Sequence, residues 1–476
     1  MSSPLSVLPD VPTARVVGNL PQVWQRAHTD SRSINAGDFF VALRGERFDA
    51  HNFLPQLSAL GVNAALAEHG LAAAGLSGVE VSNSTTALGE WAQRWRAHCA
   101  HTRVIAVTGS NGKTTVTQMI ASILAAAQPQ GWLATQGNLN NAIGVPLTLL
   151  RLQPTHQWAV VELGMNHPGE IAPLAPMAQP QVALVNNAQR EHQEHMHSVD
   201  AVADENAAVF DGLPRDGVAV MPHDSPYTGR WRARAQAAAT SVQAWTFAVN
   251  QPQATVHASA EWQGQAWQLL LHTPMGEIHC TLGAPGMHNV HNALAAATCA
   301  LAAEVPATAV QQGLTLFQPV SGRGQRLLVA RAQGQPLMVV DDSYNANPDS
   351  VLAAIEVLST LPGPRWLVLG DMGEVGEQGV AFHVEVLQRA CDAALQRVDV
   401  VGDWMTRAHQ QLSSAQQQRV RLHPTVDALQ QHVAEGYASA ASVLVKGSRF
   451  MRMERVVRAI EELGVSASPQ EPTHAA

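Results

Sequence analysis

The chain has 476 residues and a mass of 50.8 kDa, which at about 150 residues per domain predicts three domains rather than one. Its net charge of −9 argues against a general role in binding nucleic acids or anionic membranes, because both would repel an acidic chain. The four cysteines, Cys99, Cys280, Cys299 and Cys391, contain no CxxC pair, which excludes a disulfide framework and a cysteine-based zinc site.

The chain carries no signal for export or for membrane insertion. Residues 1–16 lack a basic segment followed by an apolar run, and no run of 18 apolar residues occurs anywhere. We therefore expect a cytoplasmic protein, and we take a monomer as the working expectation.

The first predicted domain comprises residues 1–83. Residues 39–43 read as a short buried strand between two glycine-containing turns. Residues 85–98 read as a helix with leucine and tryptophan side chains on one face, and this helix leads into the second predicted domain, 84–317.

The second predicted domain alternates strands with helices. The strand 104–108 runs through a glycine-containing loop into a helix whose apolar residues recur every three to four positions. Further strands are predicted at 158–163, 182–185 and 218–220, and this alternation indicates a parallel sheet covered on both faces. Residues 267–272 and 277–282 predict an antiparallel hairpin at the edge of that sheet.

The third predicted domain, 318–476, is a second doubly wound α/β unit. Its strands are predicted at 337–341, 366–371, 398–403 and 443–447, and Asn347 followed by a proline marks the start of a helix. Ligands of such sheets bind at the carboxyl ends of the strands, so the polar residues there are candidates for a site. The Pro/Ser-rich stretch 466–476 is predicted to be disordered.

The segment 108–115, TGSNGKTT, predicts a phosphate-binding loop, although it does not match the full GxxxxGK[ST] pattern. Its position between a strand and a helix directs backbone N–H groups and the positive end of the helix at phosphate oxygens. Lys113 would reach the β- and γ-phosphates, and the Thr114 hydroxyl would bind Mg²⁺. The alternative is a glycine-rich turn with a surface lysine. The predicted loop residues are Gly109, Ser110, Asn111, Gly112, Lys113, Thr114 and Thr115.

Lysine is rare in this chain, which supports the loop. Only Lys113 and Lys446 are lysines among 29 lysine and arginine residues. A lysine that persists in so arginine-rich a chain indicates a place where a guanidinium cannot substitute, with chance survival as the alternative.

Acidic and histidine residues follow the next strands. Glu162 ends a strand beside the loop and is a candidate Mg²⁺ ligand, the alternative being a solvated strand end. His192, His195 and His197 lack the spacing of a helical zinc site. A histidine is an unusual ligand for Mg²⁺, so the residues alone do not assign His192.

Together these features resemble the Mur ligase family, the ATP-dependent amide-forming enzymes of peptidoglycan precursor synthesis. The short phosphate loop is that family's variant, and further motifs follow in order along nearly the whole chain. They are DSR at 30–32, GERFDAH at 45–51, NLNNAIGVP at 138–146, ELG at 162–164, GMHNVHNA at 286–293, DDSYNANP at 341–348, LGDMGE at 369–374 and KGSR at 446–449.

The motifs YNANPDS and LGDMGE resemble one branch of the family most, the one that adds D-alanyl-D-alanine to UDP-N-acetylmuramoyl-tripeptide. The DNPR motif of the branch that adds diaminopimelate or lysine is absent. The resemblance implies a UDP-binding first domain, a central P-loop-type ATPase and a Rossmann-like last domain, with ATP and Mg²⁺ as cofactors. The tripeptide carboxylate would attack the γ-phosphate of ATP, and the dipeptide amine would then attack the resulting acyl phosphate.

The resemblance also implies roles for individual residues. Lys113, Asn141, His192 and Arg323 would be catalytic, and Thr114, Glu162 and His192 would bind Mg²⁺. Asn289 and Asn292 would lie near adenine, Arg323 near the phosphates and Asp341 near the ribose. Ser31 and Arg32 would hold the uridine diphosphate, Thr135, Asn138 and Asn140 the sugar–peptide, and Lys446 and Arg449 the incoming carboxylates. Arg32 and Arg449 as ordinary surface or structural arginines are the alternative for that pair.

One departure concerns the metal site. Many members of the family carry a carbamylated lysine that helps to bind a second Mg²⁺, and that position falls here on Asn206. We hypothesise that Asn206 offers a neutral carbonyl oxygen and that Asp204 or Glu205 supplies the missing charge. Two other functions stay open: a sister ligase with another acceptor, and a nucleotide-binding homologue that makes no bond.

Overall fold

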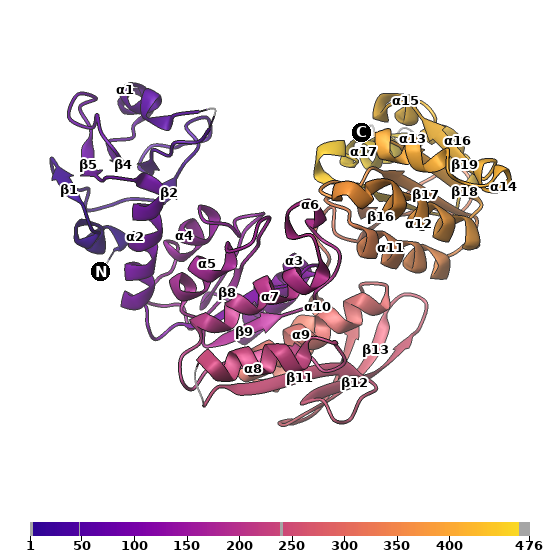
Figure 1. The fold of residues 1–476 in the computed structure, drawn as a ribbon, viewed down its shortest axis with the longest axis horizontal. Coiled ribbons are helices and arrows are strands. Elements are labelled where there is room, and N and C mark those ends of the chain that lie inside the picture. The colour runs from indigo at the N-terminus through magenta and orange to yellow at the C-terminus, as the bar shows by residue number, and fades with distance from the viewer. Residues whose placement is uncertain (1–2, 47, 239–240, 466–476) are drawn as a thin grey trace, which may run out of the picture.

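The computed structural model describes residues 3–46, 48–238 and 241–465. Within these residues the strands form three sheets, of five, nine and six strands. Each sheet is the centre of one lobe, and the first and last lobes flank the central one (Figure 1). Arg47 of the GERFDAH motif and the stretch 466–476, predicted to be disordered, lie outside the described residues.

The N-terminal sheet has the order β1-β5-β4-β3-β2, with β1 antiparallel to β5 and the other pairs parallel. The predicted strand at 39–43 is confirmed as β3, which is buried along its whole length. The bounds are β1 Arg15–Val17, β2 Ala27–His28, β3 Phe39–Val41, β4 Ala64–Ala67 and β5 Ser77–Glu80.

The helix α2, Ser84–His98, joins the N-terminal lobe to the central one and confirms the predicted connector. Asn83 caps it by accepting a hydrogen bond from the Thr86 backbone N–H. Trp91 donates its indole N–H to Pro4 O, and Trp95 donates to Leu152 O, so one face of α2 contacts both lobes.

The central sheet has the order β14-β13-β12-β11-β10-β9-β6-β8-β7. It is parallel from β7 to β12, and β13 and β14 form the predicted antiparallel hairpin at its edge. The bounds are β6 Arg103–Thr108, β7 Trp132–Ala134, β8 Trp158–Glu162, β9 Val182–Val185, β10 Val218–Pro222, β11 Gln243–Val249, β12 Val256–Trp262, β13 Trp267–Thr273 and β14 Gly276–Leu282.

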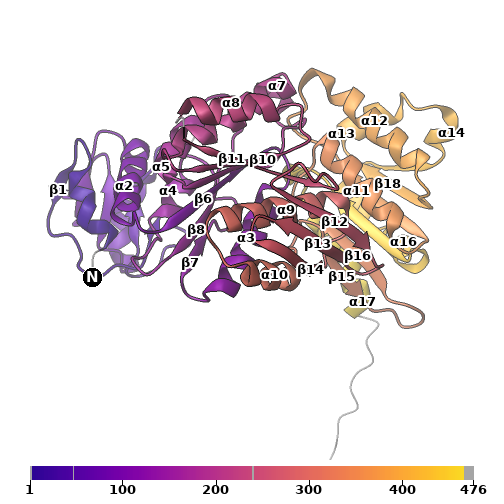
Figure 2. The ribbon, with the colours of Figure 1, turned by 90° about the horizontal axis from the view of Figure 1, so that it is seen from below.

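Helices cover both faces of this sheet, as its continuous apolar strands require. Figure 2 shows α7 and α8 on one side and α3, α9 and α10 on the other. The two faces bury separate apolar clusters, one around Val161 and Phe210 and one around Val107 and Ile120.

The C-terminal sheet has the order β15-β16-β20-β17-β18-β19, in which only β15 is antiparallel among the described strands. All four predicted strands are confirmed, while β15 and β19 were missed because they lie at the sheet edges and are only partly buried. Asn347 caps α11 as predicted. The bounds are β15 Gln325–Val329, β16 Leu337–Asp342, β17 Arg365–Gly370, β18 Arg397–Val401, β19 Val420–His423 and β20 Ser442–Lys446.

The predicted α/β class with its parallel central sheet is therefore confirmed, whereas the domain boundaries at 83/84 and 317/318 stay predictions.

The remaining elements are helices. The α-helices are α1 Leu54–Leu57, α3 Lys113–Ala127, α4 Gly144–Leu149, α5 Ile171–Ala178, α6 Gln193–Met196, α7 Val199–Asn206, α8 Thr228–Ala238, α9 Met287–Ala302, α10 Ala307–Leu316, α11 Pro348–Thr360, α12 Gly379–Asp392, α13 Asp403–His409, α14 Ser414–Gln417, α15 Val426–Gln430, α16 Val433–Ser439 and α17 Glu454–Val465. The 3₁₀ helices are η1 Pro4–Asp10, η2 Ala50–Phe53, η3 Ser58–Leu60, η4 Ala207–Gly212, η5 Gly376–Gln378 and η6 Arg449–Met451. No helix in the described part of the chain is long and apolar enough to cross a membrane.

Candidate active site

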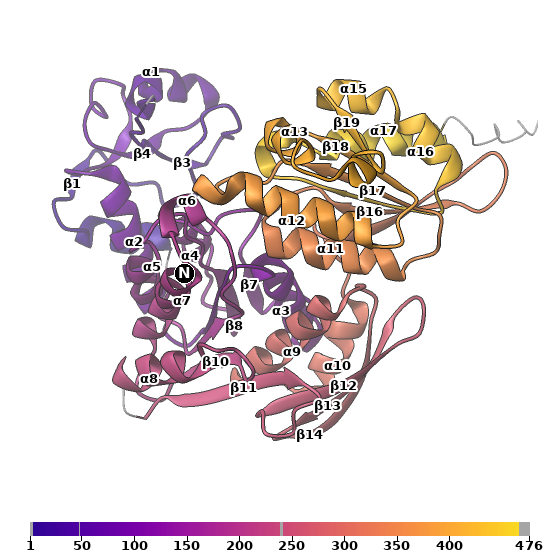
Figure 3. The ribbon, with the colours of Figure 1, turned by 45° about the vertical axis from the view of Figure 1, so that its right-hand side comes forward.

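A cavity of about 970 Å³ lies between the central and C-terminal lobes. Figure 3 shows one end of α12 of the C-terminal lobe next to α6 of the central one. The cavity brings together most of the residues that the sequence predicts: Ser110, Asn111, Gly112, Lys113, Thr114, Thr115, Asn138, Asn140, Asn141, Glu162, His192, Asn289, Asn292, Arg323, Lys446 and Arg449.

The phosphate loop connects β6 to α3, as predicted. Gly109 has φ +133° and Gly112 has φ +82°, conformations that an L side chain disfavours. A Cβ at Gly112 would also lie 2.4 Å from Asn292 Oδ1, and one at Gly109 would lie 3.0 Å from backbone nitrogens. Both glycines are therefore required by the turn, which leaves the N-terminus of α3 facing the cavity.

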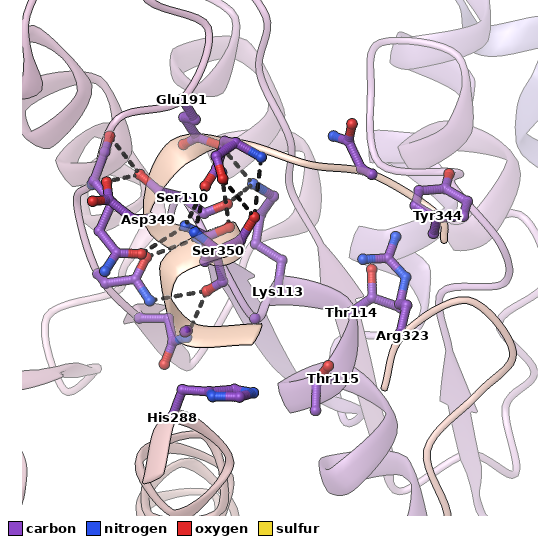
Figure 4. Close-up of a pocket in the computed structure, with 18 of the residues that line it drawn as sticks. Ser110, Lys113, Thr114, Thr115, Glu191, His288, Arg323, Tyr344, Asp349 and Ser350 are labelled. Atoms are coloured by element: carbon purple, nitrogen blue, oxygen red, sulfur yellow. Dashed lines mark hydrogen bonds and ion pairs between the residues drawn. The ribbon is translucent and has the colours of Figure 1, made fainter. Parts of the chain in front are cut away.

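Lys113 is enclosed, with its side chain only 15 % exposed, so the alternative of a surface lysine is wrong. Its Nζ donates to Gly109 O at 2.5 Å, to Ser110 O at 3.0 Å and to Glu191 Oε2 at 3.1 Å. Figure 4 shows this group of contacts at the centre of the cavity. All three ammonium donors are thus engaged before any nucleotide binds.

Glu162 is also buried, at 2 % exposure, which excludes a solvated strand end. It accepts hydrogen bonds from Thr114 Oγ1 at 2.9 Å and from Asn140 Nδ2 at 2.8 Å. A hydroxyl and a carboxylate oxygen side by side at the phosphate loop fit Mg²⁺, which prefers hard oxygen ligands and shares its coordination with phosphates and water. No group of three or more His, Cys, Asp and Glu among the described residues could hold a metal on its own.

His192 lies at the boundary between the lobes. Its Nδ1 is 2.5 Å from Glu374 Oε2, and its Nε2 is 3.8 Å from Glu191 Oε2. The close contact with His192 lowers the pKa of Glu374. His192 thus links the phosphate loop region to the LGDMGE motif.

The two residues predicted to lie near adenine, Asn289 and Asn292, belong to α9 and are hydrogen-bonded to each other. Asn292 donates to Asn289 Oδ1 at 3.2 Å and accepts from Asn186 Nδ2 at 3.0 Å. The neighbouring His288 also lines the cavity. Burial, together with the nearby charge of Lys446, lowers the pKa of His288 to about 4, so that its ring is neutral at pH 7.

The C-terminal lobe presents cations to the cavity. The guanidinium of Arg323 lies 4.1 Å from the centre of the Tyr344 ring, and that of Arg449 lies 5.6 Å from it. Lys446 Nζ donates to Asp342 Oδ2 at 2.6 Å and to Asn345 O at 3.0 Å. Arg323 and Tyr344 face the phosphate loop across the cavity (Figure 4).

Some predicted residues lie outside the cavity lining, and the ribose contact predicted for Asp341 is not supported. Asp341 is buried and accepts hydrogen bonds from Ser321 Oγ and from the backbone N–H groups of Gly322 and Ser343, so it shapes the loop that carries Arg323. Its neighbour Asp342 lines the cavity instead. Gly109, the first residue of the phosphate loop, is also absent from the lining.

Thr135 is likewise buried, and its hydroxyl accepts a hydrogen bond from the Glu162 backbone N–H at 2.9 Å, which positions β8. Ser31 and Arg32 lie in the N-terminal lobe, apart from this cavity. Arg32 is 88 % exposed at its side chain and pairs with Asp30, which lowers the pKa of that carboxyl. The uridine diphosphate contact of Ser31 and Arg32 stays a prediction.

Asn206 is not among the residues that line the cavity, and the hypothesis that it offers a carbonyl oxygen to the metal stays a prediction. Asn206 is fully buried, its Oδ1 accepts from Thr108 Oγ1 at 2.7 Å, and its Nδ2 donates to Val202 O at 3.0 Å. Asp204 pairs with Arg230 at the surface, and Glu205 accepts from the backbone N–H groups of 169 and 171. The physical reason is the helical period, which turns these carboxylates away from the loop.

Residues that the sequence did not single out join the two lobes. Arg190 donates to Asp349 at 2.7 Å and to Glu385 at 2.7 Å and stacks on Phe382 at 5.2 Å. Burial opposes its charge, but the hydrogen bonds to the two carboxylates outweigh this and raise its pKa. In the sequence, only its position two residues before His192 could have indicated that Arg190 lies near the site.

The phosphate loop itself also contacts the C-terminal lobe. Asn347 Nδ2 donates to Asn111 Oδ1 at 2.8 Å, and Asn111 Nδ2 donates back at 3.3 Å. Asn347 is at the same time the cap of α11. An amide pair between segments 236 residues apart has no local pattern that could have predicted it.

Comparisons with known proteins match this arrangement. Family models match in three parts: the Mur ligase middle domain at 107–300, the Mur ligase glutamate ligase domain at 323–449 and the Mur ligase family catalytic domain at 27–96. The UDP-N-acetylmuramoyl-tripeptide–D-alanyl-D-alanine ligase of Escherichia coli (strain K12) is 39 % identical over 437 residues, 92 % of this chain and 93 % of that protein.

Solved structures match as well. MurF from Acinetobacter baumannii is 33 % identical with a TM-score of 0.85, covering 96 % of this chain and 98 % of that one. The MurF ligase of Thermotoga maritima in complex with ADP has a TM-score of 0.78 at 24 % identity, with 93 % and 99 % covered, which shows the fold alone. The matches extend over all the sheets and the phosphate loop between β6 and α3, and they show that the chain belongs to the Mur ligase family.

Proposed function

We infer that this protein is an ATP-dependent amide ligase that joins D-alanyl-D-alanine to the tripeptide carboxylate of UDP-N-acetylmuramoyl-tripeptide, in peptidoglycan precursor synthesis. Its relatives of that name are 39 % and 35 % identical over more than nine-tenths of the chain. One observation carries the inference: Lys113, Thr114 and Glu162 of the central lobe and Arg323 of the C-terminal lobe line the same cavity.

The reaction needs ATP because a carboxylate at pH 7 is a poor acyl donor. Transfer of the γ-phosphoryl group to the tripeptide carboxylate yields an acyl phosphate and ADP, and attack by the dipeptide amine then releases phosphate. The backbone N–H groups of the phosphate loop and the ammonium of Lys113 stabilise the charge that builds on the transferring group. Mg²⁺, when bound, would supply further positive charge to the transferring phosphoryl group.

We propose the following roles for the residues around the cavity. Thr114, Glu162 and His192 would hold Mg²⁺, and Asn289 and Asn292 would contact adenine. Arg323 would reach the phosphates when the C-terminal lobe closes, and Lys446 and Arg449 would attract the carboxylates of the acceptor. Asn138 and Asn140 would face the sugar–peptide, and Asn141 would lie between that substrate and the phosphates.

A further proposal concerns the oligomeric state and the cellular location of the protein. We propose that the protein acts as a monomer in the cytoplasm. Neither proposal is needed for the chemistry.

The test is phosphate release from Mg-ATP with UDP-muramoyl-tripeptide, with and without D-alanyl-D-alanine. We expect release that needs both substrates, together with a UDP-muramoyl-pentapeptide by mass spectrometry. Turnover with a single amino acid instead would move the protein to a sister ligase. If no acceptor leads to phosphate release, the result would support a nucleotide-binding homologue that makes no bond.

A further inference from the structure

Glu191 is a buried carboxylate of the cavity to which the sequence assigned no role. It follows β9, is 5 % exposed and lines the cavity next to the phosphate loop. Its Oε2 binds Lys113 Nζ at 3.1 Å, but among the described residues its Oε1 has no hydrogen-bond partner. A buried carboxylate oxygen without a partner is costly, so this atom indicates a missing cationic or donor ligand.

When a nucleotide binds, the negative charge of Glu191 loses part of its compensation. Lys113 can reach the β- and γ-phosphates only by giving up some of its present contacts, because its three donors are all in use. Glu191 would then stand beside the negative phosphates with less compensation. The neighbouring Arg190 cannot replace Lys113, since its guanidinium is bound to Asp349 and Glu385.

His192 provides the second half of a site. Its Nε2 lies 3.8 Å from Glu191 Oε2. Two atoms that each bind Mg²⁺ at about 2.1 Å are at most about 4.2 Å apart, so His192 Nε2 and Glu191 Oε2 could share one ion once Lys113 leaves that oxygen for the phosphates. A lone histidine is a poor magnesium ligand, and an adjacent carboxylate supplies the hard oxygen that the ion prefers.

We propose that Glu191 is a magnesium ligand, which together with His192 binds a cation that also contacts the nucleotide phosphates. Only two side chains are needed, because Mg²⁺ retains water and phosphate oxygens as its other ligands. This ion would be distinct from one held by Thr114 and Glu162, which are hydrogen-bonded to each other, so the magnesium role proposed above for His192 belongs to the ion that Glu191 shares. The proposal rests on the inferred function only for the triphosphate, which supplies the remaining ligands.

The alternative is that Glu191 has a purely structural role and does not bind metal. In that case Glu191 would hold Lys113 in the free protein and would leave the site when nucleotide binds. Loss of its charge would then change the affinity for nucleotide without metal but not the affinity of the nucleotide complex for metal. The metal affinity of that complex therefore separates the two roles.

The experiment titrates Mn²⁺, followed by electron paramagnetic resonance, into the full chain saturated with β,γ-methylene-ATP and without any acceptor. We expect Glu191→Gln to weaken Mn²⁺ binding about 10-fold or more, the range found when partners of a metal site are removed. Glu194→Gln, with the same charge change at an exposed position three residues away, should stay within about twofold. Glu191→Gln within twofold of the wild type would overturn the proposal.

A second variant keeps the test informative if Glu191→Gln does not fold. Glu191→Asp retains the charge but shortens the side chain, so we expect intermediate Mn²⁺ affinity, and an unchanged affinity would contradict the metal role. No phosphate release enters this measurement. Metal binding that depends on Glu191 in a chain that forms no amide bond would leave the proposal standing while refuting the ligase function.

Discussion

The central lobe is joined to its two neighbours in opposite ways. Towards the N-terminal lobe it shares one apolar cluster, in which Leu8 and Phe39 pack with Trp91 of α2 and with Leu149 and Ile171 of the central lobe. Phe39 and Trp91 meet edge to face, with ring centres 5.5 Å apart. Separating these lobes would expose that cluster to water, so the junction is a fixed one.

Towards the C-terminal lobe the junction is polar. The apolar clusters of that lobe are drawn from residue 329 onward, and its contacts with the central lobe around the cavity are ion pairs and amide pairs, such as Arg190 with Asp349 and Asn111 with Asn347. Water can satisfy these groups when they separate, so this junction can open and re-form at small cost. From this difference we expect the polar junction, rather than the apolar one, to open and close, and closure there would bring Arg323 toward the phosphates as proposed above.

The largest expected effect comes from the apolar junction. Trp91→Ala should destabilise the protein by about 3–5 kcal/mol, because it empties a fully buried indole site between two lobes. Calorimetry combined with hydrogen exchange should show the N-terminal and central lobes losing protection together. Trp366→Ala, an equally buried tryptophan in the C-terminal lobe, is the matched control and should affect that lobe alone. Independent melting of the N-terminal lobe in Trp91→Ala would contradict a shared core.

A smaller effect is expected from the polar junction. Arg190→Met should lower kcat/KM for D-alanyl-D-alanine about tenfold, or about 1.4 kcal/mol, because the charge-assisted hydrogen bonds to Asp349 and Glu385 no longer favour the closed form. Small-angle scattering should show a larger radius of gyration, and Tm should change little. Arg389 lies on α12 like Glu385, the partner of Arg190, but it pairs with Glu356 within the same lobe, so Arg389→Met should leave both quantities unchanged. A drop in Tm as large as that of Trp91→Ala would argue against a separable junction.

The smallest effect is expected at the amide pair. Asn347→Ser keeps a capping hydroxyl for α11 but loses the hydrogen bonds to Asn111, so KM for ATP should rise about two- to threefold, with stability unchanged within about 0.5 kcal/mol. Asn347→Ala removes the cap as well and should cost about 1 kcal/mol more. Equal KM values for Asn347→Ser and the wild type would show that the phosphate loop does not sense the C-terminal lobe.

Much of the site could be predicted because its signals are local. The glycines of the phosphate loop, Lys113 and Thr114 occupy one turn between a strand and a helix, and the strand periodicity placed Glu162 beside them. Asp341 and Asn206 show the limit. Their side chains could have faced the cavity or the protein interior, and a shift of one residue on a strand, or part of a turn on a helix, decides between the two.

The sequence by itself determined the α/β class, the phosphate loop and the predicted family, and most of the site residues that it predicted do line the cavity, because these features depend on short-range patterns in the chain. The tertiary structure decided which neighbours face the cavity and that the lobes meet through an apolar junction on one side and a polar one on the other. It also buried Glu191 with one oxygen that has no partner within the described part of the chain. Those properties arise from contacts between segments far apart in the chain, such as residues 190 and 349, and no local periodicity encodes them.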